Sequence, residues 1–287
     1  MKLAVVGLGL MGGSFALDFR CIYPKSKIYG LDISKKNEKH ALELELIDEL
    51  IELEDISIAD VVLVSVPVDI SLIIIPKILN FVNKETLVFD VGSTKELICK
   101  ELLDHPKRKN FLAVHPMAGT EFSGPNAAVK GLYFNKTNII CEIDKTSKKI
   151  SRKALKIFQL LNMDILYMDS KSHDTHVAYV SHLSHISSFM LGKTVIEKEK
   201  NEKNIFNLAG SGFESTVRLA KSSPETWTPI FLQNKKNLVL AIEEYILNLN
   251  NLKQIIEDNN RSSLHSILNN TNRIKEILTN TKVENEK

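Results

Sequence analysis

The stretch Met1–Ser14, MKLAVVGLGLMGGS, decides the fold of the first part of this chain. Its apolar run Lys2–Leu8 is typical of a buried strand, and it overlaps a G-x-G-x-x-G pattern that leads into a predicted helix. The first glycine permits a tight turn, the second lets the main chain approach a pyrophosphate, and the third lets helix and strand pack closely. The N-terminus of the helix directs its free N–H groups at the anion. The stretch therefore predicts a dinucleotide-binding turn made by Gly7, Gly9, Leu10, Met11 and Gly12.

An acidic residue follows this turn at the distance that such a cofactor site uses. Asp32 ends the next apolar run, 20 residues after Gly12, and a carboxylate at that position accepts hydrogen bonds from the ribose hydroxyls of the adenosine. The same carboxylate repels a 2′-phosphate, so we expect NAD rather than NADP as the cofactor. Lys35 and Lys36 follow closely and leave the strictness of that preference open.

Short apolar runs and helical stretches alternate over the first part of the chain. The runs are continuous in Val, Ile, Leu and Phe, which is typical of strands covered on both faces. We expect strands at Lys2–Leu8, Lys27–Ile33, Val61–Ser65, Leu87–Val91, Phe111–His115, Asn138–Cys141 and Ile165–Met168. We expect helices at Met11–Phe19, Ser34–Leu44, Asp69–Phe81, Lys95–Leu103 and Ser147–Leu161. This rhythm predicts an α/β domain, residues 1–171, with a Rossmann-type, doubly wound parallel sheet. The carboxyl ends of such strands face the cofactor, which places Ser65 and Pro67 beside it.

Residues 172–280 are predicted to form an all-α domain. Its long helices are expected at Ser172–Lys200, Asn204–Lys221, Pro224–Leu249 and Leu252–Leu278. They carry apolar stripes but leave little room for a compact core of their own, which favours a bundle completed by a second subunit. We therefore expect a homodimer that forms through this domain. The polar tail 281–287 is expected to fray.

The composition excludes several classes of function. Hydrophobic residues make up 44% and charged residues 25% of the chain, which excludes a disordered or fibrous protein. The formal net charge of +2 is too balanced for a protein that binds nucleic acid or a membrane surface. Asp and Pro residues interrupt the apolar stretch Ala59–Pro76, so we expect no membrane span. The three cysteines Cys21, Cys99 and Cys141 lack metal or redox spacing, so we expect a reducing cytoplasm. A small-molecule substrate is the remaining expectation.

Two side chains outside the glycine turn carry predicted chemistry. His115 follows a strand, and an imidazole at a strand's carboxyl end, beside a nicotinamide, is placed to accept the proton of an alcohol undergoing oxidation. A purely structural histidine is the alternative. Arg218 is one of six arginines against thirty-one lysines, and an unpaired guanidinium in its apolar helical setting would be costly. A substrate carboxylate would satisfy it through two hydrogen bonds, although Glu214 or Glu121 would also serve.

A third cluster lies near the start of the predicted helical domain. On a regular helix, His173, Ser181 and His185 fall within one arc, while His176 and His182 point elsewhere. No Cys or Glu joins these histidines at ligand spacing, so we expect no metal. The shared arc predicts a polar face that lines a pocket.

Six motifs follow one another from Met1 to about Leu249: GLGLMGGS at 7–14, DVGSTK at 90–95, HPMAGTEFSG at 115–124, HD at 173–174, SHLSH at 181–185 and GFESTVRLA at 212–220. In this order and spacing they resemble the prephenate/arogenate dehydrogenase family of tyrosine biosynthesis. This resemblance is far more specific than the glycine turn alone.

The resemblance implies an NAD-dependent oxidative decarboxylation of prephenate to 4-hydroxyphenylpyruvate, with CO2 and NADH as the other products. It implies that His115 accepts a hydrogen bond from the ring 4-hydroxyl, that Ser93 helps to position both, and that Arg218 holds the side-chain carboxylate. The other substrate-binding residues that it implies are His173, Ser181, His185, Thr120, Glu121 at the entrance, and Trp227, which would reach the neighbouring subunit's site.

Several alternatives stay open. Arogenate differs from prephenate only by an amino group in place of the keto group, so an arogenate dehydrogenase fits the same motifs. A β-hydroxyacid dehydrogenase shares the glycine-rich start, but the lysine-bearing helix motif of that group is not found. A non-catalytic NAD-sensing module would not require His115 and Arg218 together. Ser215 and Val217 replace the Asp and Thr usual in the family, which leaves the gating of the site open.

Overall fold

The computed structural model describes residues 1–202 and 204–285 and divides into two compact units, Met1–Lys235 and Lys236–Lys287. Within the described part of the first unit, eight strands form a single sheet in the order β3-β2-β1-β4-β5-β6-β7-β8. The strands are β1 (Lys2–Val6), β2 (Lys27–Leu31), β3 (Glu49–Leu50), β4 (Val61–Val64), β5 (Leu87–Asp90), β6 (Phe111–Pro116), β7 (Thr137–Cys141) and β8 (Asp164–Met168). The order reverses between β1 and β4, the point at which open α/β sheets bind their ligands.

The sheet is mostly parallel, as expected, but one pair departs from the prediction of an all-parallel sheet. Strands β1 to β6 run parallel, β7 runs antiparallel to β6, and β8 is again parallel to β7. The cause is the connection 117–136, which contains one short 3₁₀ turn, Pro125–Ala127, and no α-helix. A parallel return needs a crossover that packs on the sheet, and this loop cannot supply it. The loop lies instead at the carboxyl edge of the sheet, where it borders the candidate site.

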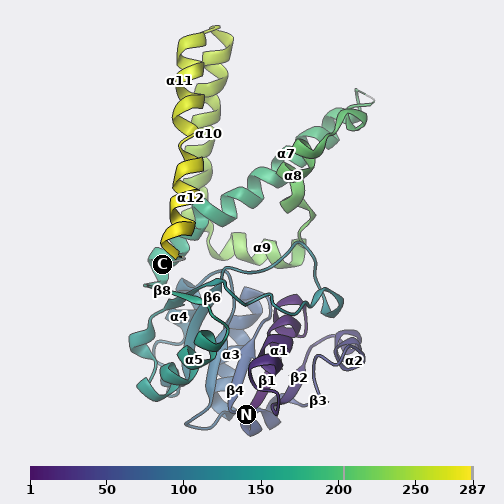
Figure 1. The fold of residues 1–287 in the computed structure, drawn as a ribbon, viewed down its shortest axis with the longest axis vertical. Helices are drawn as coiled ribbons and strands as arrows, with labels where there is room; N and C mark the ends of the chain where they lie inside the picture. Colours follow the sequence, from purple (N-terminus) through teal and green to yellow (C-terminus); the bar gives the residue numbers. More distant parts are fainter. Residues whose placement is uncertain (203, 286–287) are drawn as a thin grey trace. The chain divides into compact units, whose positions relative to one another are not determined.

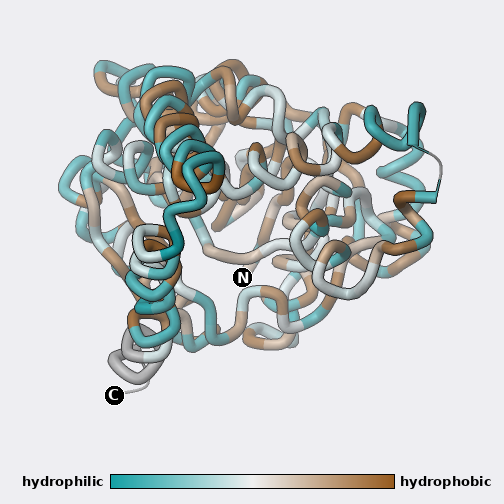
Figure 2. The backbone as a smooth tube through the Cα atoms, turned by 90° about the horizontal axis from the view of Figure 1, so that it is seen from above, coloured by the Kyte–Doolittle hydropathy of each residue, from teal (hydrophilic) through white to brown (hydrophobic). Residues whose placement is uncertain are grey.

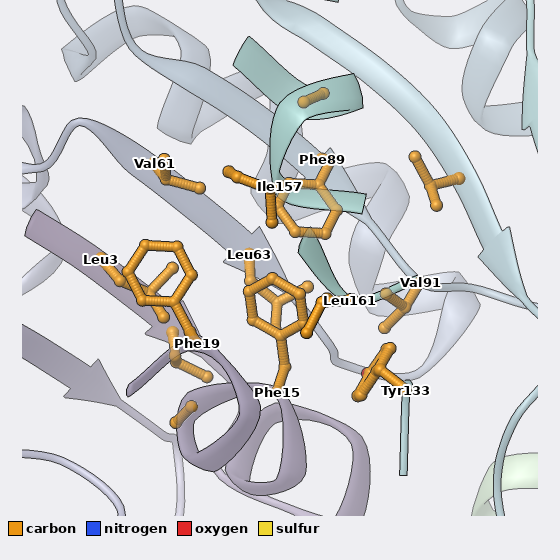
Figure 3. Packing of buried hydrophobic residues seen from close by; sticks show 14 of the residues in the cluster. Leu3, Phe15, Phe19, Val61, Leu63, Phe89, Val91, Tyr133, Ile157 and Leu161 are labelled. Atoms are coloured by element: carbon orange, nitrogen blue, oxygen red, sulfur yellow. The ribbon is translucent and has the colours of Figure 1, made fainter. Parts of the chain in front are cut away.

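Helices cover both faces of the sheet (Figure 1). One hydrophobic core lies under α1 (Leu10–Ile22), α2 (Lys35–Glu43) and α5 (Lys148–Leu160). The other lies under α3 (Val68–Phe81) and α4 (Glu96–Glu101). Figure 3 shows Phe15 of α1 in the first core, where its ring meets those of Phe89 and Tyr133 edge-on at centroid distances of 5.3 and 5.2 Å. These fully buried aromatic contacts fix α1, and with it the glycine turn, on the sheet.

The remaining helices of the first unit are shorter than predicted. The expected helix Ser172–Lys200 consists of α6 (Ser170–Val177), a π-helical turn at Ala178–His182, and α7 (Leu183–Glu199). The expected helix Asn204–Lys221 is wrong in extent, because only α8 (Ser211–Val217) and short 3₁₀ turns form there. Gly210 precedes α8, and Asn204 has a left-handed φ of 80°, which no right-handed helix accommodates. The unit ends with α9 (Pro224–Gln233), which packs on α3.

The second unit is helical. The prediction of two helices that meet near residue 250 is wrong, because α10 (Lys235–Glu257) continues through that point. Asn259, with a left-handed φ of 50°, ends it, and the chain then reverses into α11 (Arg261–Thr271) and α12 (Ile274–Asn285) (Figure 1). The tail expected to fray carries α12 as far as Asn285, and residues 286–287 lie outside the described part. Figure 2 shows hydrophobic and hydrophilic residues mixed along the helices. Among the residues described, no helix has the length and hydrophobicity to cross a membrane.

Candidate active site

Most of the predicted site residues border one cavity of about 660 Å³ within the first unit. The glycine turn, the ends of β4, β5 and β6, the 117–136 loop and the segment from α6 to α9 all contribute to it. The predicted residues that line it are Gly9, Leu10, Met11, Ser65, Pro67, Ser93, His115, Thr120, Glu121, Ser181, His185, Arg218 and Trp227. Four other predicted residues, all described, do not line it: Gly7, Gly12, Asp32 and His173.

The glycine turn has the geometry that a pyrophosphate cradle requires. Gly7 has φ +93°, and a Cβ there would lie 2.6 Å from the Ser65 carbonyl oxygen. A Cβ on Gly12 would lie 2.1 Å from the Gly7 carbonyl oxygen, so both positions exclude larger residues. At Gly9, by contrast, a Cβ would meet no atom closer than 4.0 Å, which leaves the main chain open toward the cavity. These three glycines therefore act as the motif predicted: two allow close packing of the chain and one exposes it.

Asp32 lies at the end of β2 and supports the turn. Its Oδ2 accepts a hydrogen bond of 2.8 Å from the Leu8 main-chain N–H, and its Oδ1 accepts one of 2.9 Å from Ser34. Lys35 pairs with Glu38 at 2.9 Å, so its ammonium already has a carboxylate partner. A carboxyl group next to the turn and a lysine ammonium that already has a carboxylate partner both fit a dinucleotide without a 2′-phosphate. The residues present therefore fit NAD.

His115 is the last but one residue of β6, and its side chain is buried. Its Nδ1 lies 2.8 Å from Nε2 of His173. Burial lowers the pKa of His115 well below its ordinary value, and electrostatic repulsion from His173, when that ring is protonated, and from Lys95 lowers it further. The imidazole is therefore neutral at physiological pH, which is the form that can accept a proton.

His173 does not line the cavity, contrary to the expectation. It is fully buried behind His115 and contacts Asp174 through its other ring nitrogen at 2.7 Å. Ser181 and His185 lie eight and twelve positions after His173, which is about 12 to 18 Å along a helix axis. His173 therefore meets the sheet at His115, while Ser181 and His185, further along the segment, border the cavity.

Arg218 reaches the cavity from the turn that follows α8, and not from an apolar helix as expected. Its side chain is 52% exposed and pairs with Glu121 of the 117–136 loop at 3.2 Å. A hydrogen bond from its own main-chain N–H and the Arg218 guanidinium both lower the pKa of the Glu121 carboxyl. An exposed ion pair of this kind contributes little stability, so an incoming carboxylate can replace Glu121 at low cost.

Trp227 lines the cavity of its own chain, and its reach into a neighbouring subunit's site stays a prediction. Its ring stacks on His185 with centroids 3.4 Å apart. Nδ1 of His185 lies 3.0 Å from the Ser181 carbonyl oxygen, which only an N–H donor can satisfy. Burial lowers the pKa of His185, so its neutral ring presents Nε2 as an acceptor.

Other residues near the cavity were missed by the sequence analysis. Lys136, the last residue of the 117–136 loop, lines the cavity but belongs to no motif. Asn234 donates to the Asp174 carbonyl at 2.6 Å and approaches Nδ1 of His182 at 3.1 Å. His182 is buried, its pKa is lowered to about 4 by that burial, and it lies against the Ser93 main chain. For the buried contacts among Asn234, Asp174 and His182, the HD and SHLSH motifs were the only signals in the sequence. Within the described residues, no group of three or more His, Cys, Asp or Glu side chains could hold a metal.

Two family models match consecutive parts of the chain. "Prephenate dehydrogenase, nucleotide-binding domain" matches residues 15–167, and "Prephenate dehydrogenase, dimerization domain" matches residues 169–270. Together with the glycine turn and the cavity, these matches define an NAD-dependent oxidoreductase. The chain belongs to the prephenate dehydrogenase family.

Three relatives illustrate the similarity. A crystal structure of prephenate dehydrogenase from A. aeolicus, in complex with hydroxyphenyl propionate and NAD+, has a TM-score of 0.88 and 35% identity, covering 97% of this chain and 98% of that one. The prephenate dehydrogenase of Bacillus subtilis (strain 168) is 29% identical over 91% of this chain and 71% of its own length. The structure of Synechocystis arogenate dehydrogenase has a TM-score of 0.76 and 27% identity, covering 97% of this chain and 100% of that one.

Proposed function

We propose that this chain catalyses the NAD-dependent oxidative decarboxylation of prephenate to 4-hydroxyphenylpyruvate. One observation carries the assignment: the neutral imidazole of His115 and the guanidinium of Arg218 border the same cavity as the glycine turn. Prephenate carries a hydroxyl at one end of its ring and a pyruvyl carboxylate at the other. A base and a cation on one cavity match those two ends.

The chemistry divides between the two residues. When bound, NAD supplies the acceptor for the hydride that leaves ring carbon C4. His115 accepts the proton of the 4-hydroxyl as that carbon becomes a carbonyl, and Ser93 borders the same part of the cavity. The ring carboxylate then leaves as CO2, and its bonding electrons make the ring aromatic. His115 returns its proton to the resulting phenolate oxygen, so no net proton is released.

Arg218 holds the pyruvyl carboxylate through two parallel hydrogen bonds, and this carboxylate takes the place of Glu121 on the guanidinium. A second cation on the ring carboxylate would slow the reaction, because it would stabilise the charged ground state more than the departing CO2. His185 and Trp227 close the cavity around the side chain of the substrate.

The test is the appearance of NADH absorbance with prephenate or arogenate, each with NAD and with NADP. We expect turnover with prephenate and NAD, and weaker use of NADP because of Asp32. No NADH with either substrate would overturn the assignment. Turnover with arogenate alone would favour the second candidate, for which the Glu121 carboxylate beside Arg218 is the supporting observation, since it would attract an ammonium group.

The assembly and location are also proposals. We propose domains at residues 1–171 and 172–280, close to the two family-model matches. A homodimer through the helical part is supported by the dimerization-domain match and by large apolar side chains that are exposed on α7 and α10, such as Met190, Leu240 and Leu247. The cytoplasm is the proposed location because of the cysteine usage given above.

A further inference from the structure

A buried chain of three side chains runs behind the cavity. His115 contacts His173 at 2.8 Å between Nδ1 and Nε2, and His173 contacts Asp174 at 2.7 Å between Nδ1 and Oδ1. The three residues are 7%, 0% and 3% exposed, so water does not compete for these contacts. Each ring nitrogen that takes part in these two contacts therefore has one defined role, as a hydrogen-bond donor or as an acceptor.

The carboxylate of Asp174 is fixed as an acceptor. Its Oδ1 accepts a hydrogen bond of 2.7 Å from the main-chain N–H of Lys95, and its Oδ2 accepts one of 2.9 Å from Glu96. Main-chain N–H groups only donate, so both oxygens must be acceptors. Asp174 consequently cannot donate to His173. Asp174 must therefore accept the hydrogen bond between the two residues, and this fixes the donor and acceptor order from this end.

The direction then propagates to the cavity. Nδ1 of His173 must carry the proton that is donated to Asp174. Burial lowers the pKa of His173, so its ring is neutral and its Nε2 has only a lone pair. Nδ1 of His115 must then donate to that lone pair, which leaves Nε2 of His115 without a proton.

We propose that Asp174 is the positioning residue that fixes the tautomer of His115, so that Nε2 can accept the substrate's hydroxyl proton. This role rests on the proposed function, in which His115 is the base. Asp174 touches neither substrate nor cofactor and acts only through His173. Its negative charge also stabilises the imidazolium that forms when His115 takes up the proton.

The surrounding charges explain why this help is needed. Lys95 is fully buried, and its ammonium donates to Asp90 and to the Val114 carbonyl beside His115. From the helical segment, His173 contacts His115, and His182 lies near enough to lower its pKa. A positive charge on His115 is opposed by Lys95, whereas Asp174 and Asp90 favour a positive charge on the neighbouring ring of His173.

The first test reads the tautomers without turnover. In ¹⁵N-labelled protein, long-range ¹H–¹⁵N spectra distinguish a protonated ring nitrogen from a bare one. We expect wild-type His115 to carry its proton on Nδ1. In Asp174→Asn or His173→Phe, we expect the tautomer of His115 with the proton on Nε2 to be populated as well. His173→Phe leaves the contacts of Asp174 to Lys95 and Glu96 in place, so it serves even if Asp174→Asn does not fold. A proton on Nε2 of wild-type His115, or an unchanged His115 in the variants, would overturn the proposal.

The second test is kinetic. We expect Asp174→Asn to lower kcat on the order of 10²-fold, with KM and NAD affinity changed little. Loss of the negative charge lowers the pKa of the His115–His173 pair, so the acidic limb of the kcat profile moves to lower pH. Asp48→Asn is the matched control, because Asp48 also accepts a main-chain hydrogen bond, from Ile28, but has no histidine partner. An equal loss in both variants, or no shift of the limb, contradicts the proposal. If wild-type protein does not oxidise prephenate, the proposed function fails while the spectra still decide the tautomer.

Discussion

At the scale of single residues, the site depends on how burial and pairing set the state of two groups. His115 is buried and neutral, and its hydrogen bond to His173 holds the ring in place. Arg218 is exposed and always charged, and Glu121 neutralises it until a substrate carboxylate arrives. One residue is tuned for proton transfer and the other for binding, so their substitution should affect different kinetic constants.

We expect His115→Asn to lower kcat by roughly 10²–10⁴, the range that a positioned general base contributes. NAD affinity should stay near the wild-type value, because the glycine turn and Asp32, which would hold the dinucleotide, are unchanged. Steady-state kinetics and NAD titration measure both. The control is His176→Asn, an exposed histidine of α6 that does not line the cavity. Near-normal turnover by His115→Asn would remove His115 from its role.

We expect Arg218→Ala to raise the KM for prephenate roughly 10- to 100-fold, the cost of losing a hydrogen-bonded charge pair, with a smaller change in kcat. Lys221→Ala is the matched control, since Lys221 is a cation on the same turn that pairs with Glu214 and does not line the cavity. An unchanged KM in Arg218→Ala contradicts the carboxylate clamp.

At the scale of elements, the segment from α6 through the π-helical turn Ala178–His182 to α7 supplies one polar side of the site. The sequence correctly placed a polar, histidine-rich helix at the cavity, because spacing and residue type suffice for that. It could not predict which histidine faces which way. The regular period of 3.6 residues put His173 on one face with Ser181 and His185, but it does not tell how far along the segment the cavity extends. His173 meets His115 of the sheet instead, and the tertiary contacts of this region, such as those that Asn234 makes with Asp174 and His182, leave no local signature.

We expect deletion of Val180, which is 70% exposed, to restore a regular helix at this turn. A π-helical turn holds one residue more than a regular turn, so its removal leaves Ser181 and His185 on the face that borders the cavity. NAD affinity and helical content should persist, and kcat/KM for prephenate should stay within about tenfold of the wild-type value, which NAD titration, circular dichroism and steady-state kinetics check. A fall of about 10²-fold or more, the cost of misplaced binding groups, would contradict this interpretation of the turn.

At the scale of the whole molecule, the apolar runs and the glycine turn predicted the doubly wound sheet and its carboxyl edge. The antiparallel direction of β7 was not predicted. It follows from the connection 117–136, which contains no helix and so cannot form the crossover that a parallel strand needs. The helical part was less predictable. Its helix ends depend on left-handed residues such as Asn204 and Asn259, whereas apolar spacing continues through them. The cavity itself could not be derived, since it joins residues more than 200 positions apart.

Buried neutral histidines should also make the fold sensitive to acid. The pKa values of His115, His173 and His182 are all lowered by burial, so the unfolded chain binds protons first as the pH falls below about 6.5. Stability is then lost progressively down to the folded pKa values. For His182, with a folded pKa of about 4, this amounts to on the order of 3 kcal/mol by pH 4. Denaturant midpoints at fixed protein concentration should fall from pH 7 to pH 5; a constant midpoint contradicts the assignment of neutral buried rings.

The most direct measurement is a crystal structure of this chain with NAD and 4-hydroxyphenylpyruvate bound. We expect the phenol oxygen within hydrogen-bond distance of Nε2 of His115, and the carboxylate paired with Arg218 in place of Glu121. A product bound in the opposite direction, or outside the cavity that these two side chains share, would contradict the proposed chemistry at its centre.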